Sequence, residues 1–479
     1  MKNIFFLSFL FNFCLLYAIE SISLRSLGAK GDGVTDDTAV LIKAIKMADV
    51  KGMDITGENL NYKLSGSHEL SLKKLSLSDI KICFDNDYKK QFNIKINSNN
   101  IKLSNINVAG GRGTYNKNIE QWRVFSEEAK VKSIEPVPSH IFYFVTSLNT
   151  ATISIDNFYA KDIHAQSCLT VYTLGKVYLQ NLNFSNISNK TFQVYHTFDD
   201  GKTQAGETHL DSAVAKNIGI LPVQILVDGK MYKTALGTYM PQSSFNFIVT
   251  GGNFYASNIN VNNYASTGLT ADRNLYFEAK NVNLSSNISN IYSNNPSGAL
   301  WFEACKKAYV KDVKIIIKNR SKLDLNFDNS AVHFYGVNSN IVIDNMIIQS
   351  DKLSLNKGVR GSLSGENFIT INNLDVTGGF KSEAVFFASL DSDMKNTLSF
   401  GNVTLRSNNM VFDMMKSVNL NNVIGITKNE IVSYRLPVGI SKIGNFSLKK
   451  SNLNQVEVSA RTKDIVINKN INVKKIIYK

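Results

Sequence analysis

The sequence is poor in proline and cysteine. Six prolines occur in 479 residues, which suits long hydrogen-bonded strands because proline cannot donate to a β-ladder. Of the four cysteines, Cys14 lies in an N-terminal apolar run, and an odd number of widely spaced ones follow: Cys83, Cys168 and Cys305. We therefore expect buried free thiols and no structural disulfide, so that stability comes from the core.

Long apolar stretches are also missing beyond the first residues, and we expect no membrane span. Lys2 is followed by an apolar run from Ile4 to Leu16 and then by Ala18. This pattern is typical of a secretory signal peptide, which we place at 1–18. The predicted localisation is therefore secreted or periplasmic.

Acidic residues are fewer than basic ones. The sequence has 39 Asp and Glu and 53 Lys and Arg, which gives a formal net charge of +14. This excess of positive charge indicates an anionic partner. For an exported chain without a nucleic-acid motif we predict an acidic polysaccharide and no nucleic acid. A solvated, Lys-rich surface without a partner would show the same charge. The oligomeric state stays open between a monomer and a homotrimer.

What the chain has in abundance is a repeat. From about residue 70, short alternating apolar segments recur, and each is typical of two strands joined at an asparagine bend, as at Asn105 and Asn157. Stacked asparagines of successive coils are expected to hydrogen-bond along the axis. The repeat predicts an all-β fold, a parallel β-helix, over 61–430, with loop insertions near 110–140 and 197–244. The last coils and a C-terminal cap are expected over 431–479.

The stretch from Gly28 to Ala48 predicts a cap at the start of this solenoid. Its three glycines permit tight turns with positive φ, and Asp36 or Thr35 can cap a helix whose first turn carries Asp37. One face of the helix is apolar at helical spacing: Leu41, Ala44, Ile45 and Ala48. We expect this helix, within a cap region at 19–60, to cover the open end of the first coil.

The run Gly28-Ala-Lys-Gly-Asp-Gly-Val-Thr-Asp-Asp-Thr-Ala39 resembles the N-terminal signature of the pectate-lyase-like (pectin-lyase-like) superfamily. The resemblance implies a single-stranded right-handed parallel β-helix with an N-terminal α-helical cap, acting on polysaccharide. The Asn-Thr-Asp, Gly-His-Gly and Arg-Ile-Lys motifs of polygalacturonases do not occur in this sequence, so no catalytic residue is carried over. Residues 299–425 more weakly resemble the exported β-helix proteins of colanic acid biosynthesis. That resemblance implies a non-catalytic polysaccharide-binding protein in exopolysaccharide or capsule biosynthesis and export.

Aligning the coils by their bends gives a register for the strands that precede them. It places four apolar residues at equivalent inward positions: Leu300, Val332, Val359 and Val385. Because alternate strand residues face outward, one outward column is expected to hold Trp301, His333 and Arg360. The neighbouring column would hold Glu303 and Tyr335, and the preceding coil places Asp272 beside Glu303.

This face offers two kinds of polysaccharide chemistry. A carboxylate pair can divide the acid and the base or nucleophile duties of glycoside hydrolysis, whereas a His or Tyr base with an Arg suits uronate elimination. We predict a polysaccharide lyase or glycoside hydrolase; outward residues that merely share salt bridges are the alternative. The candidate catalytic residues are Asp272, Glu303, His333, Tyr335 and Arg360. The candidate substrate-binding residues are Trp301, Arg273, His196, Asp199 and Asp200.

A second polar cluster carries side chains of the types that bind metal ions. It consists of His196, Asp199, Asp200, Glu207, His209 and Asp211. Its oxygens can bind Ca²⁺ and its histidines a transition metal, but the spacing matches no metal motif. We therefore predict a polar loop beside a substrate groove on the face described above. We expect no metal site and no cofactor, with bound Ca²⁺ as the open alternative.

Overall fold

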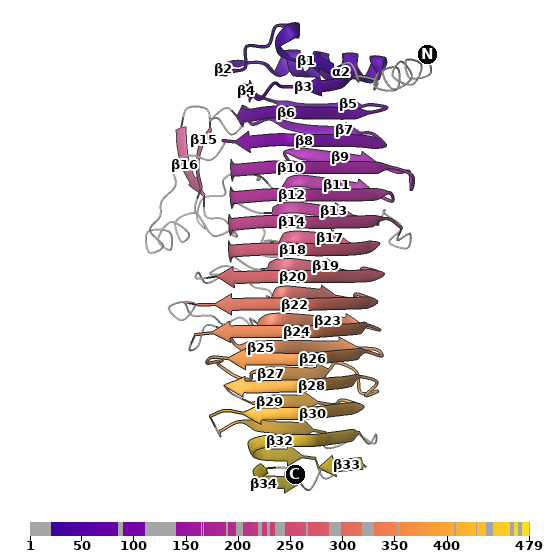
Figure 1. Ribbon diagram of the computed structural model, residues 1–479, viewed down its shortest axis with the longest axis vertical. Coiled ribbons are helices and arrows are strands. Elements are labelled where there is room, and N and C mark those ends of the chain that lie inside the picture. Colours follow the sequence, from indigo (N-terminus) through magenta and orange to yellow (C-terminus); the bar gives the residue numbers. More distant parts are fainter. Residues whose placement is uncertain are drawn as a thin grey trace, which may run out of the picture.

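The computed structural model is a long stack of parallel strands wound into a β-helix, which confirms the predicted all-β solenoid (Figure 1). The structure describes residues 21–84, 90–110, 140–163, 165, 167–187, 190–197, 205–218, 223–227, 230–234, 245–264, 267–286, 298–318, 330–351, 355–406, 409–427, 429–436, 444–459, 464–467 and 472–478. The predicted signal peptide and nearly all of the insertion near 110–140 lie outside these residues. Among the described residues, no helix has the length and apolarity that crossing a bilayer requires.

Each full coil contributes one long and one short strand, and each strand pairs in parallel with its counterpart in the next coil. The long strands are β6 (Leu75–Phe84), β8 (Asn100–Ala109), β10 (Thr152–Ile163), β12 (Lys176–Ile187), β14 (Glu207–Ile218), β18 (Asn253–Tyr264), β20 (Tyr276–Ser286), β22 (Lys307–Ile317), β24 (Asn340–Ser350), β26 (Phe368–Thr377), β28 (Thr397–Arg406), β30 (Ser417–Gly425) and β32 (Asn445–Val458). The short strands are β5 (Ser67–Ser71), β7 (Asn93–Asn97), β9 (Phe142–Thr146), β11 (Ser167–Thr173), β13 (Lys190–Tyr195), β17 (Phe245–Thr250), β19 (Thr267–Asp272), β21 (Gly298–Glu303), β23 (Ser330–Val337), β25 (Lys357–Ser364), β27 (Val385–Ser389), β29 (Met410–Asp413) and β31 (Ile431–Arg435). The short strands form the face that carries the candidate site.

The long strands bend at the predicted asparagines. Asn105 and Asn157 have φ values of 55° and 53°, the left-handed conformation that asparagine tolerates better than most residues. The Asn157 amide donates to the Asn105 side-chain oxygen at 3.1 Å, and Asn105 donates to Asp79 at 2.8 Å. The same ladder of side-chain hydrogen bonds continues in later coils, where the donors are Asn345, Asn373, Asn402 and Asn422. The predicted asparagine ladder is confirmed.

Large apolar side chains fill the interior from coil to coil. Phe302 stacks on Phe334 with ring centroids 5.0 Å apart and nearly parallel planes, and Phe158 lies 5.9 Å from Phe184. All four rings are fully buried, and such contacts supply most of the stabilisation available to a chain without disulfides. Cys168 and Cys305 are buried free thiols as predicted, whereas Cys83 is half-buried.

The predicted cap helix forms α2 (Thr38–Lys51) and lies at the N-terminal end of the stack (Figure 1). Its predicted apolar face is buried, but the helix begins at Thr38, so Asp37 is not in the first turn. The Asp37 carboxylate instead accepts hydrogen bonds from the backbone N–H groups of Lys30 and Gly31, at 2.8 and 2.9 Å. Asp36 accepts from the N–H of Thr38 at 3.0 Å. Around the helix, the strands β1 (Ser21–Ser23), β2 (Asp32–Asp36), β3 (Asp54–Thr56) and β4 (Asn61–Leu64) already belong to the parallel stack.

Two parts of the described chain depart from simple coils. Within the insertion predicted near 197–244, β15 (Val223–Val227) and β16 (Lys230–Thr234) form an antiparallel hairpin, seen beside the solenoid in Figure 1. At the other end, β33 (Asp464–Ile467) and β34 (Asn472–Tyr478) both pair with β32. Strands therefore continue through the region where the last coils were expected.

Candidate functional site

The register predicted for the short strands is confirmed. Asp272 of β19 pairs with Glu303 of β21, and Glu303 pairs with Tyr335 of β23. In the neighbouring column, Trp301 pairs with His333, and His333 pairs with Arg360 of β25. Adjacent strands lie about 4.8 Å apart, so the fold gathers these residues on one face.

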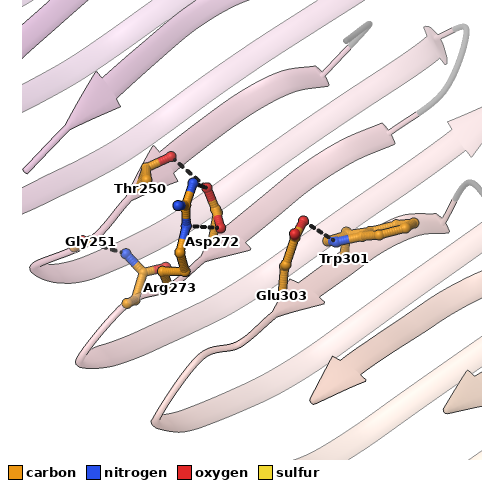
Figure 2. Close-up of polar contacts among 7 residues, drawn as sticks. Thr250, Gly251, Asp272, Arg273, Trp301 and Glu303 are labelled. Atoms are coloured by element: carbon orange, nitrogen blue, oxygen red, sulfur yellow. Dashed lines mark hydrogen bonds and ion pairs between the residues drawn. The ribbon is translucent and has the colours of Figure 1, made fainter. Parts of the chain in front are cut away.

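Asp272 is held as a carboxylate at the end of β19. Only 6% of the residue is exposed, and a buried carboxylate needs partners because desolvation disfavours its charge. Arg273 supplies them: its Nε lies 2.9 Å from one carboxylate oxygen and a terminal nitrogen lies 3.0 Å from the other. The Thr250 hydroxyl donates a further bond at 2.9 Å (Figure 2). The guanidinium thus binds the carboxylate through two charge-assisted hydrogen bonds.

Glu303 occupies the next rung in a different electrostatic environment. Burial raises the pKa of its carboxyl group, and the negative charge of Asp272 raises it further. The Trp301 indole N–H donates to Glu303 at 3.2 Å and opposes part of the rise in pKa, as does the Arg273 charge. Figure 2 shows the two carboxyl groups on adjacent strands, with Arg273 beside Asp272 and Trp301 beside Glu303. The pair therefore joins a carboxylate in an ion pair with Arg273 to a carboxyl group with a raised pKa.

His333 differs from the prediction because it is only 1% exposed. Its ring lies 4.3 Å from the Trp301 ring, and its other strand neighbour is Arg360. These two large side chains flank the outward position that alternation assigned to the histidine. Burial, followed by the charges of Arg360 and Lys357, lowers the pKa of His333 to about 3. Among the described residues, neither ring nitrogen has a hydrogen-bond partner, so the ring is a neutral imidazole packed behind Trp301.

The remaining members of the predicted face are more accessible. Tyr335 is 43% exposed on the rung beyond Glu303, while Trp301 and Arg360 are half-buried. The Arg273 side chain is 60% exposed although it binds Asp272. Both a cation and aromatic surface are thus available to a ligand beside the carboxyl pair.

His196 lies in the interior and not on the surface where a substrate contact was predicted. It is fully buried, with one ring nitrogen 2.8 Å from the Thr173 carbonyl oxygen and the other 2.7 Å from the Thr208 hydroxyl. This histidine is engaged on both sides and serves the fold. The other two predicted contacts of that loop, Asp199 and Asp200, lie outside the described residues.

Three residues of the second polar cluster, Glu207, His209 and Asp211, belong to the strand β14 and not to a loop. His209 contacts Glu207 and stacks between Tyr178 and Tyr255, with ring centroids 5.3 and 4.8 Å away. These residues lie on long strands and not on the short-strand face. Within the described ranges, no three His, Cys, Asp or Glu side chains gather in a way that could hold a metal ion.

We call the column that holds Asp272, Glu303 and Tyr335 the site column. It extends further toward the N-terminus than the sequence predicted. Tyr172 pairs with Tyr195, Tyr195 with Thr250, and Thr250 with Asp272. The two tyrosine rings stack with centroids 4.4 Å apart. The signal was present, since the segments Cys168–Tyr172 and Thr191–Tyr195 show the same alternation as the coils downstream. Both segments fit the coil pattern, and placing their last residues in the outward column of Asp272 and Glu303 would have found both tyrosines.

Comparison with known proteins adds little to this geometry. No family model matches the chain, and neither does any curated protein. Among solved structures, that of the pre-mature bacteriophage phi29 gene product 12 is similar at a TM-score of 0.38 and 13% sequence identity, over 91% of this chain and 67% of that one. At that TM-score the similarity carries no argument about function, and the fold is established by the strand pairing itself.

Proposed function

We propose that this chain is a polysaccharide-active enzyme that cleaves an acidic polysaccharide by glycoside hydrolysis at Asp272 and Glu303. The observation that carries the proposal is the contrast within the carboxyl pair. Asp272 is bound by Arg273 and Thr250, whereas Glu303 has a raised pKa. Glycoside hydrolysis needs one carboxyl group that gives a proton and one that stays ionised.

The roles follow from the two environments. Glu303, with its raised pKa, donates a proton to the glycosidic oxygen as the bond to the leaving sugar breaks. The Asp272 carboxylate stabilises the positive charge that develops on the sugar ring. A water molecule then forms a bond to the anomeric carbon of that ring and gives up a proton, which restores the protonated Glu303. Arg273 can shift part of its exposed guanidinium toward an acidic substituent of the substrate, and Trp301 offers apolar surface to a ring.

The same geometry favours hydrolysis over elimination. A uronate lyase needs a base that reaches a sugar C–H. His333 is buried behind Trp301, and its pKa, lowered to about 3, leaves it a weak base. Tyr335 is exposed, and among the described residues no side chain makes a hydrogen bond to its hydroxyl. Hydrolysis is therefore the reaction that we propose.

Three further parts of the proposal rest on the sequence. The apolar run before Ala18 supports export to the periplasm or the medium. The Gly28–Ala39 signature supports membership of the pectate-lyase-like superfamily. The charge of +14 supports an acidic chain as the substrate.

A second candidate, binding without cleavage, is favoured by one observation. Both Asp272 oxygens are engaged and the residue is 6% exposed, as expected of a carboxylate that orders an arginine. In that case the face would hold a polysaccharide during assembly or export of a surface polymer.

One experiment separates these functions. The purified mature protein is incubated with a panel of acidic polysaccharides while reducing ends and the ultraviolet absorbance of unsaturated uronates are followed. We expect reducing ends to increase without absorbance. Absorbance that grows with the reducing ends identifies a lyase, and measurable binding without either signal identifies the second candidate.

A further inference from the structure

A buried lysine lies on the same face, upstream of the carboxyl pair. Lys190, at the start of β13, is 7% exposed. Its ammonium group donates to the Gln193 side-chain oxygen at 2.9 Å. Among the described residues, no carboxylate pairs with it. A buried ammonium whose contacts within the described chain are all with neutral groups is costly, because one neutral hydrogen bond replaces only part of the solvation that it has lost.

The groups around Lys190 form a connected polar network. The Gln193 oxygen also accepts a bond from the Tyr195 hydroxyl at 2.9 Å, while its amide donates to the Thr170 hydroxyl at 3.0 Å. That hydroxyl lies 2.7 Å from a ring nitrogen of His140. The network draws on β11, β13 and His140, which lies two residues before β9, and it comes nearest to solvent at the half-buried Tyr195 and His140.

The electrostatics of the network favour an incoming negative charge. Burial lowers the pKa of Lys190 to about 8, and burial together with the Lys190 charge lowers the pKa of His140 to about 4. The lysine is thus the positive charge of a network otherwise neutral at physiological pH. A carboxylate at the ammonium group would supply the missing counter-charge and use donors that Gln193 leaves free.

The position of the network relates it to the carboxyl pair. Tyr195 pairs with Thr250, and Thr250 pairs with Asp272. At about 4.8 Å per coil, the two sites lie about 10 Å apart along the solenoid axis. A sugar chain that runs along this face would pass both.

We propose that Lys190, Gln193 and Tyr195 form a subsite that binds the carboxylate of an acidic sugar two coils from Asp272. The subsite rests on the proposed function for its substrate and names the substituent that the face recognises. The subsite would make the chain bind acidic polysaccharides more tightly than neutral ones. Arg273 can provide only part of this preference, because it is already bound to Asp272.

The test compares charged and neutral forms of the same chains. Binding of oligosaccharides from polygalacturonate, alginate and hyaluronate, each beside its carboxyl-reduced form, is measured by calorimetry for wild type, Lys190→Met and Lys190→Arg. Free acetate and glucuronate show whether the carboxylate alone suffices. Lys314→Met, which removes an exposed lysine of β22, is the matched control.

We expect Lys190→Met to weaken binding of a carboxylated chain more than about tenfold, because a buried charge loses its partner, and to leave the reduced chain unchanged. Lys190→Arg should retain part of the preference, and Lys190→Met should unfold at the same or a higher temperature, because a buried unpaired charge is gone. Equal losses for both chains, with a lower unfolding temperature, would identify a structural lysine and overturn the subsite.

The outcomes also separate the subsite from the proposed cleavage. Unchanged binding by Lys190→Met in a protein that cleaves the chain overturns the subsite alone. Carboxylate-selective binding that depends on Lys190, in a wild-type protein that cleaves nothing, supports the subsite and overturns the hydrolase. Wild-type protein that binds no carboxylated chain overturns the subsite.

Discussion

Two columns of stacked polar side chains run along this solenoid, and they differ in kind. In the asparagine ladder an amide donates to the side-chain oxygen of an asparagine, or in some coils of an aspartate such as Asp79, as Asn373 does to Asn345 and Asn402 to Asn373. In the site column the residue type changes over successive rungs, from Tyr195 to Thr250, Asp272 and Glu303. Repetition satisfies neutral groups with one another, whereas the changing column concentrates charge and displaced pKa values. We take the first as structure and the second as function.

The largest expected effect sharpens this contrast at the carboxyl pair. Glu303→Gln keeps the shape of the side chain but removes the proton donor, so we expect cleavage to fall by about 10²- to 10⁴-fold. The unfolding temperature should change little. Glu278→Gln, on the long strand β20, is the matched control and should cleave normally. A rate within a factor of three of wild type for Glu303→Gln rejects Glu303 as the acid.

Acid pH should reveal the buried His333. Its pKa of about 3 in the folded chain lies below the ordinary value of 6.5, so the unfolded chain binds more protons between these values and stability falls as the pH drops through that window. His333→Phe removes the titrating imidazole and with it this loss of stability. We expect wild type to lose up to about 3 kcal/mol more than the variant between pH 7 and pH 4, measured by denaturant unfolding at each pH. Parallel curves would contradict the burial of the ring.

At neutral pH the two buried histidines should respond oppositely to the same replacement. His196→Phe strips the Thr173 carbonyl and the Thr208 hydroxyl of their buried partner, which we expect to cost about 3 kcal/mol. His333→Phe leaves no such group behind and should change stability by less than about 1 kcal/mol. Urea unfolding of both variants measures the difference, and equal losses would show that the two rings play the same role.

The asparagine ladder should respond in stability and not in activity. Asn258 and Asn402 each give and receive one ladder bond, but only Asn258 of the two has a left-handed backbone, with φ of 57°. We expect Asn258→Ala to cost about 2 kcal/mol and Asn402→Ala about 1 kcal/mol. Asn258→Gly, which accepts the positive φ, should fall between them. A loss of cleavage in folded Asn258→Ala would break the division between the columns.

The smallest expected effect concerns Tyr335, which lies in the site column but carries no role in the proposed hydrolysis. Tyr335→Phe keeps the exposed ring and removes the hydroxyl, so the cleavage rate should stay within about twofold of wild type. Initial rates of reducing-end release measure it. A drop of a hundredfold would instead assign the hydroxyl to proton transfer and return the lyase to consideration.

Much of this architecture could be predicted from the sequence because it depends on local periodicity. The bend at Asn105, the apolar face around Ala44 and the pairing of Asp272 with Glu303 all follow from alternation and repeat length. What failed depends on neighbours. Alternation points His333 outward but does not say that Trp301 and Arg360 cover it.

For the same reason, the sequence did not predict the network around Lys190, and it wrongly predicted a loop at Glu207 to Asp211. Nothing local distinguishes Lys190 from the exposed lysines, because its burial results from packing across several coils. The segment Glu207 to Asp211 looked like a loop because it is polar, yet it pairs over its whole length with β12 and β18. In a solenoid, an outward polar face satisfies strand pairing as well as an apolar one.

The central claim is that the site column acts on a polysaccharide while the ladder holds the fold. The most direct test is the rate of reducing-end release per folded molecule on an acidic polysaccharide that wild type cleaves, compared between Glu303→Gln and Asn258→Ala. The account predicts a fall of at least about a hundredfold for Glu303→Gln and a rate close to wild type for folded Asn258→Ala. Equal rates in the two variants, or no cleavage of any acidic polysaccharide by wild type, would contradict it.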